Sequence, residues 1–319
     1  MLKFPIDDLL DEEQCYGFLV ELLHPEEGLR CPEGHELPDG QAPHKRPEGR
    51  APVVSYRCHQ CGAVFNVFTG TVLSGIRHDC STIVMILRGF AQGVPTQHLA
   101  DELGLDYSGA QLEWRHRLQE SALDTHLPGK LSDPEAEADE MFQNAGEKGA
   151  GRPEREDSPR RRANKKRGPE RSKTTARPPR GVARGRCCGE IRLSVCPDTQ
   201  QTTIEREMSA KLAPGGRLCT DESHAYNQMS EQGYEHQAVC HGDGEFGRDE
   251  DGDSFCEIHS NTMEGIWTGL RNHLRRFRGV SKSYLAQYVA VFEIAYNHSG
   301  QFFALLRAML LPDFTFAPI

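Results

Sequence analysis

The sequence lacks any long uninterrupted run of apolar residues. None of its apolar stretches approaches the roughly 18–20 residues that a helix needs to span a bilayer, which excludes an integral membrane protein. The first residues, MLKFPIDDLLDEEQ, lack the basic-then-apolar order of a secretory signal, so we expect an unsecreted, cytoplasmic protein. Eleven cysteines in such a chain favour metal ligands and buried thiols over a disulfide framework.

Basic residues are fewer than acidic ones, with 37 lysines and arginines against 47 aspartates and glutamates, which gives a net charge of −10. The positive charge is also unevenly spread. Residues 148–186 contain 15 basic and 4 acidic residues, which leaves 22 basic and 43 acidic residues in the rest of the chain. Because the Debye length is only about 8 Å at physiological salt, such a tract overrides the overall negative charge at short range.

The basic insert, residues 148–186, is rich in glycine and proline and has no hydrophobic period. A solvated linker is the simplest interpretation of that composition. Several lysine and arginine clusters within one insert instead favour contact with a polyanion. The residues expected to contact DNA are Arg160, Arg161, Arg162, Lys165, Lys166 and Arg167.

A metal site is predicted in residues 31–75, which are rich in glycine, proline and turn residues. The segment CHQCG has the Cys-x-x-Cys spacing with which two thiolates grip one tetrahedral ion from a tight turn, and CPEGH offers a second pair. The predicted ligands are Cys31, His35, Cys58 and Cys61, with His44 and His59 as alternatives to His35. Because both segments that flank CHQC have strand character, we expect a zinc ribbon that holds one structural Zn²⁺.

Helical patterns lie on both sides of this ribbon. Residues 1–30 predict a short acidic helix, and residues 80–127 are helical by period. Within the second region, a helix over 96–103 ends at Gly104 and another begins near Ser108, which is the spacing of a helix-turn-helix. The side chains expected to reach bases and phosphates are Gln111, Arg115 and Arg117. A three-helix unit that uses these residues for packing alone is the alternative.

Two aspartates lie where strands are expected to end. Asp139 lies in the alternating segment 135–140, and Asp221 follows the short apolar segment 216–220. Between them, residues 190–196 and 202–208 alternate like the two strands of a hairpin. The acidic segment 247–255 resembles a calcium loop at a glance, but its spacing does not fit the twelve-residue loop, and we interpret it as a solvated acidic loop.

A third carboxylate, Glu264, lies in the helical segment HSNTMEGIWTGLRNHLRRFRG. Arg271, Arg275 and Arg278 follow it on one predicted helical stripe, where they would contact a phosphodiester backbone. Two strand-end aspartates with a carboxylate on a later helix form an arrangement that binds two Mg²⁺ ions about 4 Å apart.

The order of these motifs resembles that of the zinc-ribbon DDE transposases of bacterial insertion sequences. The most specific pieces are TDESHAY, HSNTMEGIW and the closing YVAVFEIAYN. The resemblance implies an α/β protein in which a ribonuclease-H-like catalytic domain, with a mixed sheet and flanking helices, occupies residues 132–319. It also implies that Asp139, Asp221 and Glu264 form the metal-binding triad.

The activity implied by this resemblance is Mg²⁺-dependent cleavage of double-stranded DNA at terminal inverted repeats, followed by strand transfer into target DNA. At least a dimer, associated with the bacterial nucleoid, is expected to bring two ends together. Some relatives are described with asparagine as the third triad member, so Asn261 can share or replace the role of Glu264, and Arg271 stands where relatives often carry lysine. Two alternatives stay open: a DNA-binding regulator or domesticated protein with an inactive catalytic domain, and a ribonuclease-H-like nuclease that cuts without joining.

Overall fold

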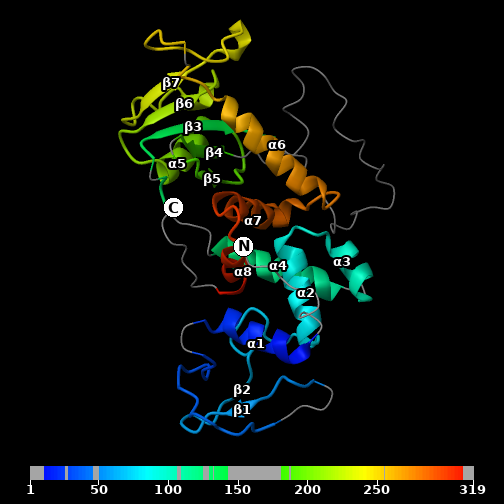
Figure 1. The fold of residues 1–319 in the computed structure, drawn as a ribbon. Helices are drawn as coiled ribbons and strands as arrows, with labels where there is room; N and C mark the ends of the chain where they lie inside the picture. The colour runs from blue at the N-terminus through cyan, green and yellow to red at the C-terminus, as the bar shows by residue number, and fades with distance from the viewer. Residues whose placement is uncertain are drawn as a thin grey trace, which may run out of the picture. The chain divides into compact units, whose positions relative to one another are not determined.

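The computed structural model describes residues 11–25, 28–45, 50–105, 109–124, 129–131, 133–142, 181–186, 188–254 and 256–311. The chain divides into two compact units (Figure 1). The helical unit comprises Met1–Leu127 and His298–Ile319, and the sheet unit comprises Pro128–Asn297. None of the helices in the described part of the chain combines the length and the apolar character that crossing a bilayer requires.

The α-helices are α1 (Glu12–Leu23), α2 (Cys80–Ala91), α3 (Thr96–Leu103), α4 (Gly109–Asp124), α5 (Gln201–Lys211), α6 (Asn261–Arg275), α7 (Leu285–Asn297) and α8 (Phe302–Leu310). The strands are β1 (Tyr56–Arg57), β2 (Val64–Phe65), β3 (Glu135–Glu140), β4 (Gly181–Gly185), β5 (Ile191–Leu193), β6 (Arg217–Thr220) and β7 (Glu235–Ala238). Short 3-10 turns occur at η4 (His224–Tyr226), η5 (His241–Asp243) and η6 (Lys282–Tyr284).

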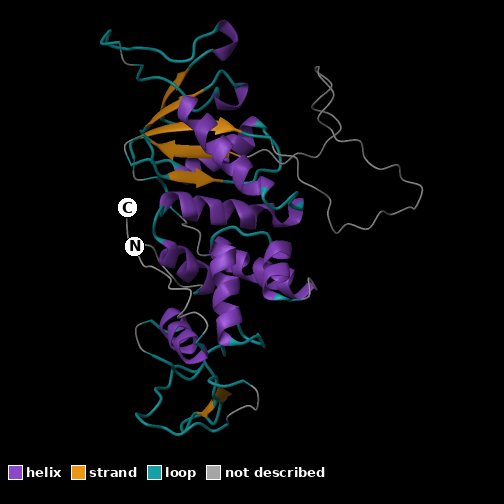
Figure 2. Cartoon of the chain, turned by 45° about the vertical axis from the view of Figure 1, so that its right-hand side comes forward, coloured by secondary structure: helices purple, strands orange, loops and turns teal. Residues whose placement is uncertain are grey.

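The sheet unit is built on a mixed sheet with strand order β5-β4-β3-β6-β7, whose strands are labelled in Figure 1 and drawn in orange in Figure 2. Strands β3, β4 and β5 are antiparallel neighbours, whereas β3 with β6 and β6 with β7 are parallel pairs. The central strand β3 therefore joins an antiparallel half to a parallel half. A mixed sheet of this kind with flanking helices is consistent with a ribonuclease-H-like domain.

Side chains of β3 alternate between two hydrophobic cores, as the period of a strand requires. Ala136 and Ala138 pack with Ile204 and Met208 of α5 on one face. On the other face, a core formed by α6, α7 and β5 also takes in Met141, just beyond the end of β3. Residues 137 and 139 point to that second face, so the predicted catalytic aspartate of β3 is turned toward α6.

The edge strand β5 is covered by polar side chains of α7. The Glu293 carboxylate accepts a hydrogen bond from the Leu193 backbone N–H at 2.6 Å. The Asn297 side chain accepts from the backbone N–H of Ile191 at 2.8 Å and donates to its carbonyl at 3.0 Å. These bonds satisfy strand groups that an exposed edge leaves unpaired, which gives the FEIAYN segment a structural function.

The helical unit places α8 beside α1, α2 and α4. The rings of Phe18 and Phe303 meet edge to face at a centroid distance of 5.9 Å. The Glu12 carboxylate accepts hydrogen bonds from the backbone N–H groups of Cys80 and Ser81 at 2.8 and 3.0 Å, and so caps the first turn of α2. Helix α3 ends as expected at Gly104, whose φ of 62° is left-handed.

Three expectations differ from this fold. The sheet unit ends at Asn297, whereas the sequence predicts one domain over residues 132–319, and α8 belongs to the helical unit. Residues 202–208 lie in helix α5 and do not form a hairpin strand, because Ile204 and Met208, one turn apart, are both buried. The end of the basic insert, residues 181–185, forms strand β4, whereas residues 143–180, with the predicted DNA contacts from Arg160 to Arg167, lie outside the described residues.

Candidate active site of the sheet unit

The parallel pairing of β3 with β6 brings the two predicted aspartates together. Glu135, Ala136 and Glu137 pair with Arg217, Leu218 and Cys219, a constant offset of 82 residues. The same offset places Asp139 beside Asp221, where β6 has just ended. Neighbouring strands lie about 4.8 Å apart and paired residues point to the same face, so both carboxylates emerge at one edge on the α6 side.

Helix α6 is fixed to this edge by a direct hydrogen bond. The indole Nε1–H of Trp267 donates to Asp139 Oδ2 at 2.7 Å. Trp267 is buried, and Glu264 lies one helical turn before it in the first turn of α6. The bond therefore holds the exposed Glu264 near the two strand-end aspartates.

Two carboxyl groups of strand β3 have raised pKa values. Burial raises the pKa of Asp139, and the charges of Asp221 and Glu264 add to the increase against the hydrogen bonds from Trp267 and the Glu140 backbone. On the opposite face of β3, burial raises the pKa of Glu140 to about 7, although its hydrogen bond with Tyr226 works against the shift. Carboxyl groups whose pKa is raised by burial and neighbouring charge occur often at functional sites.

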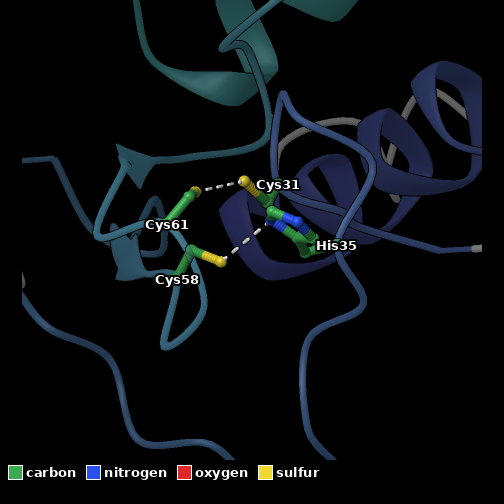
Figure 3. A group of neighbouring side chains, drawn as sticks. All are labelled: Cys31, His35, Cys58 and Cys61. Carbon is green, nitrogen blue, oxygen red and sulfur yellow. Dashed lines mark hydrogen bonds between the residues drawn. The ribbon is translucent and has the colours of Figure 1, made fainter.

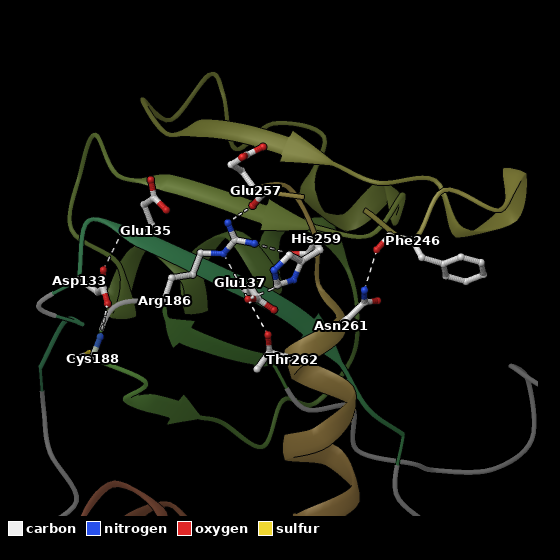
Figure 4. A network of polar contacts seen from close by, with 10 residues as sticks. All are labelled: Asp133, Glu135, Glu137, Arg186, Cys188, Phe246, Glu257, His259, Asn261 and Thr262. Atoms are coloured by element: carbon white, nitrogen blue, oxygen red, sulfur yellow. Dashed lines mark hydrogen bonds and ion pairs between the residues drawn. The ribbon is translucent and has the colours of Figure 1, made fainter. Parts of the chain in front are cut away.

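A buried polar network holds the start of α6 against β3 (Figure 4). Glu137 is 1% exposed, and its carboxylate accepts hydrogen bonds from Arg186 Nε at 3.3 Å and Thr262 Oγ1 at 3.0 Å. His259 Nδ1 lies 3.6 Å from the same carboxylate. Arg186 also donates to the backbone carbonyls of Glu257 and His259. Sequence reasoning missed this network, because it counted Arg186 within the basic insert.

Asn261, the alternative to Glu264 as the third triad residue, contacts the loop that carries Phe246. Its side-chain amide donates to the backbone carbonyl of Phe246 at 2.8 Å (Figure 4). Glu264, in contrast, acts electrostatically on Asp139. Asn261 is therefore engaged by the loop that carries Phe246, whereas the charge of Glu264 acts on Asp139.

The predicted arginine stripe is only partly on the helix. Arg271 and Arg275 are exposed on α6, and Arg275 donates to the Asn272 side chain at 3.1 Å. Helix α6 ends at Arg275, so Arg278 lies in the following turn with a φ of 51°. The expectation that one helical stripe carries all three arginines is wrong for Arg278, although its side chain is exposed.

The four predicted zinc ligands converge in the helical unit (Figure 3). One ligand atom from each of Cys31, His35, Cys58 and Cys61 lies within 4.8 Å of the others. Cys31 Sγ is 3.4 Å from Cys61 Sγ, and Cys58 Sγ is 3.5 Å from His35 Nδ1. Ligands at 2.0–2.3 Å from a tetrahedral zinc ion are separated by roughly 3.3–3.8 Å, so this donor set fits Zn²⁺.

Two similar turns build this cluster. The Gly34 N–H donates to the Cys31 carbonyl at 2.8 Å, and the Gly62 N–H donates to the Cys58 carbonyl at 3.0 Å. Both glycines have positive φ, 81° and 76°, which their missing Cβ allows. Hydrogen bonds, chiefly from the Cys61 backbone, lower the pKa of the Cys58 thiol to about 6, and this favours the thiolate that a metal binds.

Helix α4 does not present Arg115 to DNA, contrary to the sequence-based expectation. Arg115 is 1% exposed, its Nε donates to Thr96 Oγ1 at 2.8 Å, and its guanidinium lies 4.1 Å from the centre of the Phe90 ring. It packs the three helices together. Arg117 is half-buried and stacks 4.4 Å above the Trp114 ring, while the Gln111 side chain lies outside the described residues.

The acidic segment 247–255 contributes to a second cluster that the sequence analysis did not anticipate. Carboxylate oxygens of Asp249, Asp251, Asp253 and Glu257 lie within 4.8 Å of one another. The Asp249 carboxylate accepts backbone hydrogen bonds from Gly252 at 2.6 Å and Ser254 at 2.8 Å. Three of the four carboxylates are exposed or nearly so, and the loop's own backbone already uses several of their oxygens.

Comparison with known proteins identifies the sheet unit. The family model of the ISXO2-like transposase domain matches residues 131–297, which coincide almost completely with that unit. No curated protein matches the chain. A match of this extent also carries a transposase function and, with it, DNA as a binding partner. Together with the sheet topology and the strand-end aspartates, it shows that the chain belongs to the ISXO2-like family of insertion-sequence DDE transposases.

Proposed function

We propose that this transposase cleaves terminal inverted repeats and joins them to target DNA with two Mg²⁺ ions held by Asp139, Asp221 and Glu264. The observation that supports this most directly is the β3–β6 register, which places Asp139 beside Asp221 on the face that α6 covers. The three carboxylates supply the hard oxygen ligands that Mg²⁺ prefers.

The electrostatics of the site fit bound cations. Asp221 and Glu264 both raise the pKa of Asp139, so the negative charges repel one another. A divalent cation would remove that repulsion. A pair of ions about 4 Å apart would be shared among the three carboxylates.

The residues of the chain then have distinct functions in the reaction. Bound Mg²⁺ would lower the pKa of an attacking water or 3′-hydroxyl and stabilise the leaving oxygen. Trp267 orients the Asp139 carboxylate, and the Glu137 network holds the first turn of α6, so that the geometry exists before DNA binds. Arg271 and Arg275 are exposed on α6 and would contact the phosphodiester backbone.

The helical unit would supply DNA recognition. Zn²⁺ bound by Cys31, His35, Cys58 and Cys61 would be structural, because four protein ligands leave no open position. Helices α3 and α4 would act as a helix-turn-helix, with the half-buried Arg117 in place of the buried Arg115 as the basic side chain that contacts DNA. Because two ends must be joined, the active form on DNA would be at least a dimer.

Cleavage of a labelled duplex that carries the terminal inverted repeat tests this proposal. Asp139→Asn and Asp221→Asn should abolish Mg²⁺-dependent nicking and leave DNA affinity nearly unchanged. Glu135→Gln, on the same face of the same strand, is the matched control and should cleave normally. Binding without nicking by the wild type would favour a regulator, and nicking without strand-transfer products on a plasmid target would favour a nuclease.

A further inference from the structure

The loop between β7 and α6 presents an aromatic ring to solvent. Phe246 is 61% exposed, the highest value among the large hydrophobic side chains in the described parts of the chain. A single exposed apolar residue needs no explanation by itself. Phe246 differs because its loop is held firmly in place next to the candidate active site.

Hydrogen bonds tie the loop to the residues beside both ends of the proposed metal site. Glu222, which directly follows Asp221, accepts from the backbone N–H groups of His241 at 2.8 Å and Gly242 at 3.1 Å. From the other side, Asn261 at the start of α6 donates to the Phe246 carbonyl at 2.8 Å. The backbone that carries the ring is thus anchored to the strand end of Asp221 and to the helix of Glu264.

A second set of contacts makes the loop rigid in itself. Arg248 Nε donates to the Glu245 carboxylate at 2.7 Å, and another nitrogen of its guanidinium donates to the Ala238 carbonyl at 2.9 Å. Arg248 also forms an antiparallel bridge with Ile258. Little conformational freedom is left for a ligand to restrict, so a partner of the ring would bind a preformed surface.

The ring has a neighbour on one side. The His241 ring lies 5.5 Å from the Phe246 ring at an interplanar angle of 33°. Figure 4 shows the Phe246 side chain pointing away from the buried network that its loop adjoins. A flat partner can therefore stack on the remaining exposed surface.

We propose that Phe246 is a nucleobase-stacking residue, on which one base adjacent to the scissile phosphate lies after leaving the DNA stack. The inference rests on the proposed function for the place of the scissile phosphate. Stacking on an aromatic ring is tolerant of base identity, because every base has a π-face. Loss of such a ring weakens binding by roughly 5- to 150-fold per base.

Fluorescence of 2-aminopurine tests this, because the fluorescence rises when the base leaves its stack. The probe replaces each base in turn on either side of the cleavage site in the terminal-repeat duplex, and the full chain is added without Mg²⁺. We expect a rise at one position with the wild type, its loss with Phe246→Ala and its retention with Phe246→Trp. Tyr296→Ala, which removes another exposed aromatic residue of the sheet unit, should behave as the wild type.

The outcomes separate this inference from the proposed function. Normal cleavage by Phe246→Ala with unchanged DNA affinity and fluorescence would overturn the stacking role and leave the proposed activity standing. If the wild type gives the fluorescence rise but does not cleave, and Phe246→Ala removes the rise, the stacking role is supported and the proposed activity is contradicted. A change in oligomeric state upon Phe246→Ala without any change in DNA binding would show a protein contact and also overturn the proposal.

Discussion

Substitution of Glu137 by glutamine tests whether the buried network holds α6 on the sheet. The substitution keeps the shape of the side chain and removes its charge. Glutamine can still accept the Thr262 hydrogen bond, but it loses the ion pair with Arg186, whose side chain is 12% exposed and keeps its positive charge. Breaking a buried ion pair costs about 3–5 kcal/mol. Since Arg186 keeps two carbonyl acceptors, we expect the lower end, about 3 kcal/mol.

Two tryptophans allow each unit to be followed separately. Trp267 lies in the sheet unit and Trp114 in the helical unit, and the chain has no others. In a Trp114→Phe background, fluorescence during urea unfolding reports the sheet unit alone, which avoids assuming that both units unfold in one step. A loss of about 3 kcal/mol in a domain of this size lowers the melting temperature by roughly 6–12 °C.

Two controls show which result would refute this reasoning. Glu135→Gln, two residues earlier on the same face, should change the unfolding free energy by less than about 0.5 kcal/mol. Asp139→Asn should abolish cleavage without destabilising the fold, because burial and its acidic neighbours already oppose the charged form of Asp139. If Glu137→Gln unfolds with the wild-type free energy, the network does not hold α6 and the positioning argument is wrong.

Further predictions concern the metal cluster, helix α4 and the largely buried ion pair of Glu207 with Lys211. Chelation should release zinc in a one-to-one ratio to the chain, as measured with a colorimetric indicator, and Cys58→Ser should bind none. Arg115→Leu should destabilise the helical unit by about 2–3 kcal/mol, whereas Arg117→Ala should lower DNA affinity with little change in stability. Burial of Glu207 opposes its ionisation, but hydrogen bonds from Lys211 and Ser194 outweigh burial and lower its pKa. Because the pKa of Glu207 is depressed, its charge stabilises the fold at pH values above the unfolded pKa near 4.5, and this stabilisation is lost as the pH falls through the folded pKa. Glu207→Gln should therefore cost about 1–2 kcal/mol at pH 7 and progressively less as the pH is lowered below 4.5.

Local chemistry made several parts of the structure predictable from sequence. Cys58-x-x-Cys61 with its following glycine specifies a turn, and the turn brings both sulfurs to one point. Gly104 ends α3 because a left-handed residue stops a helix. Asp139 lies near the end of an alternating segment and Asp221 follows a short apolar one, both patterns predict strands, and a parallel pairing then brings such strand ends to the same edge.

Other parts depend on tertiary packing that no short pattern reveals. A window of seven residues such as 202–208 fits both a strand and one buried helical face, and only the sheet beneath α5 decides between them. The sequence around Arg115 indicates a basic surface residue, but the packing of α3 and α4 around Phe90 buries it. The Glu137 network joins residues up to 125 positions apart, so its members carry no shared local signal.

The pairing of Glu140 with Gly181 in β3 and β4 has a consequence for how this transposase can change over time. The chain leaves the ladder at Glu140 and returns to it at the directly opposed Gly181, so the pairing of these strands does not depend on how many residues lie between Phe142 and Gly181. Each doubling of the length of such a connection costs only about 0.6 kcal/mol in closure entropy. The stretch between Phe142 and Gly181 can therefore be shortened, lengthened or exchanged while Met141 keeps its place in the core and Asp139 its place on the strand.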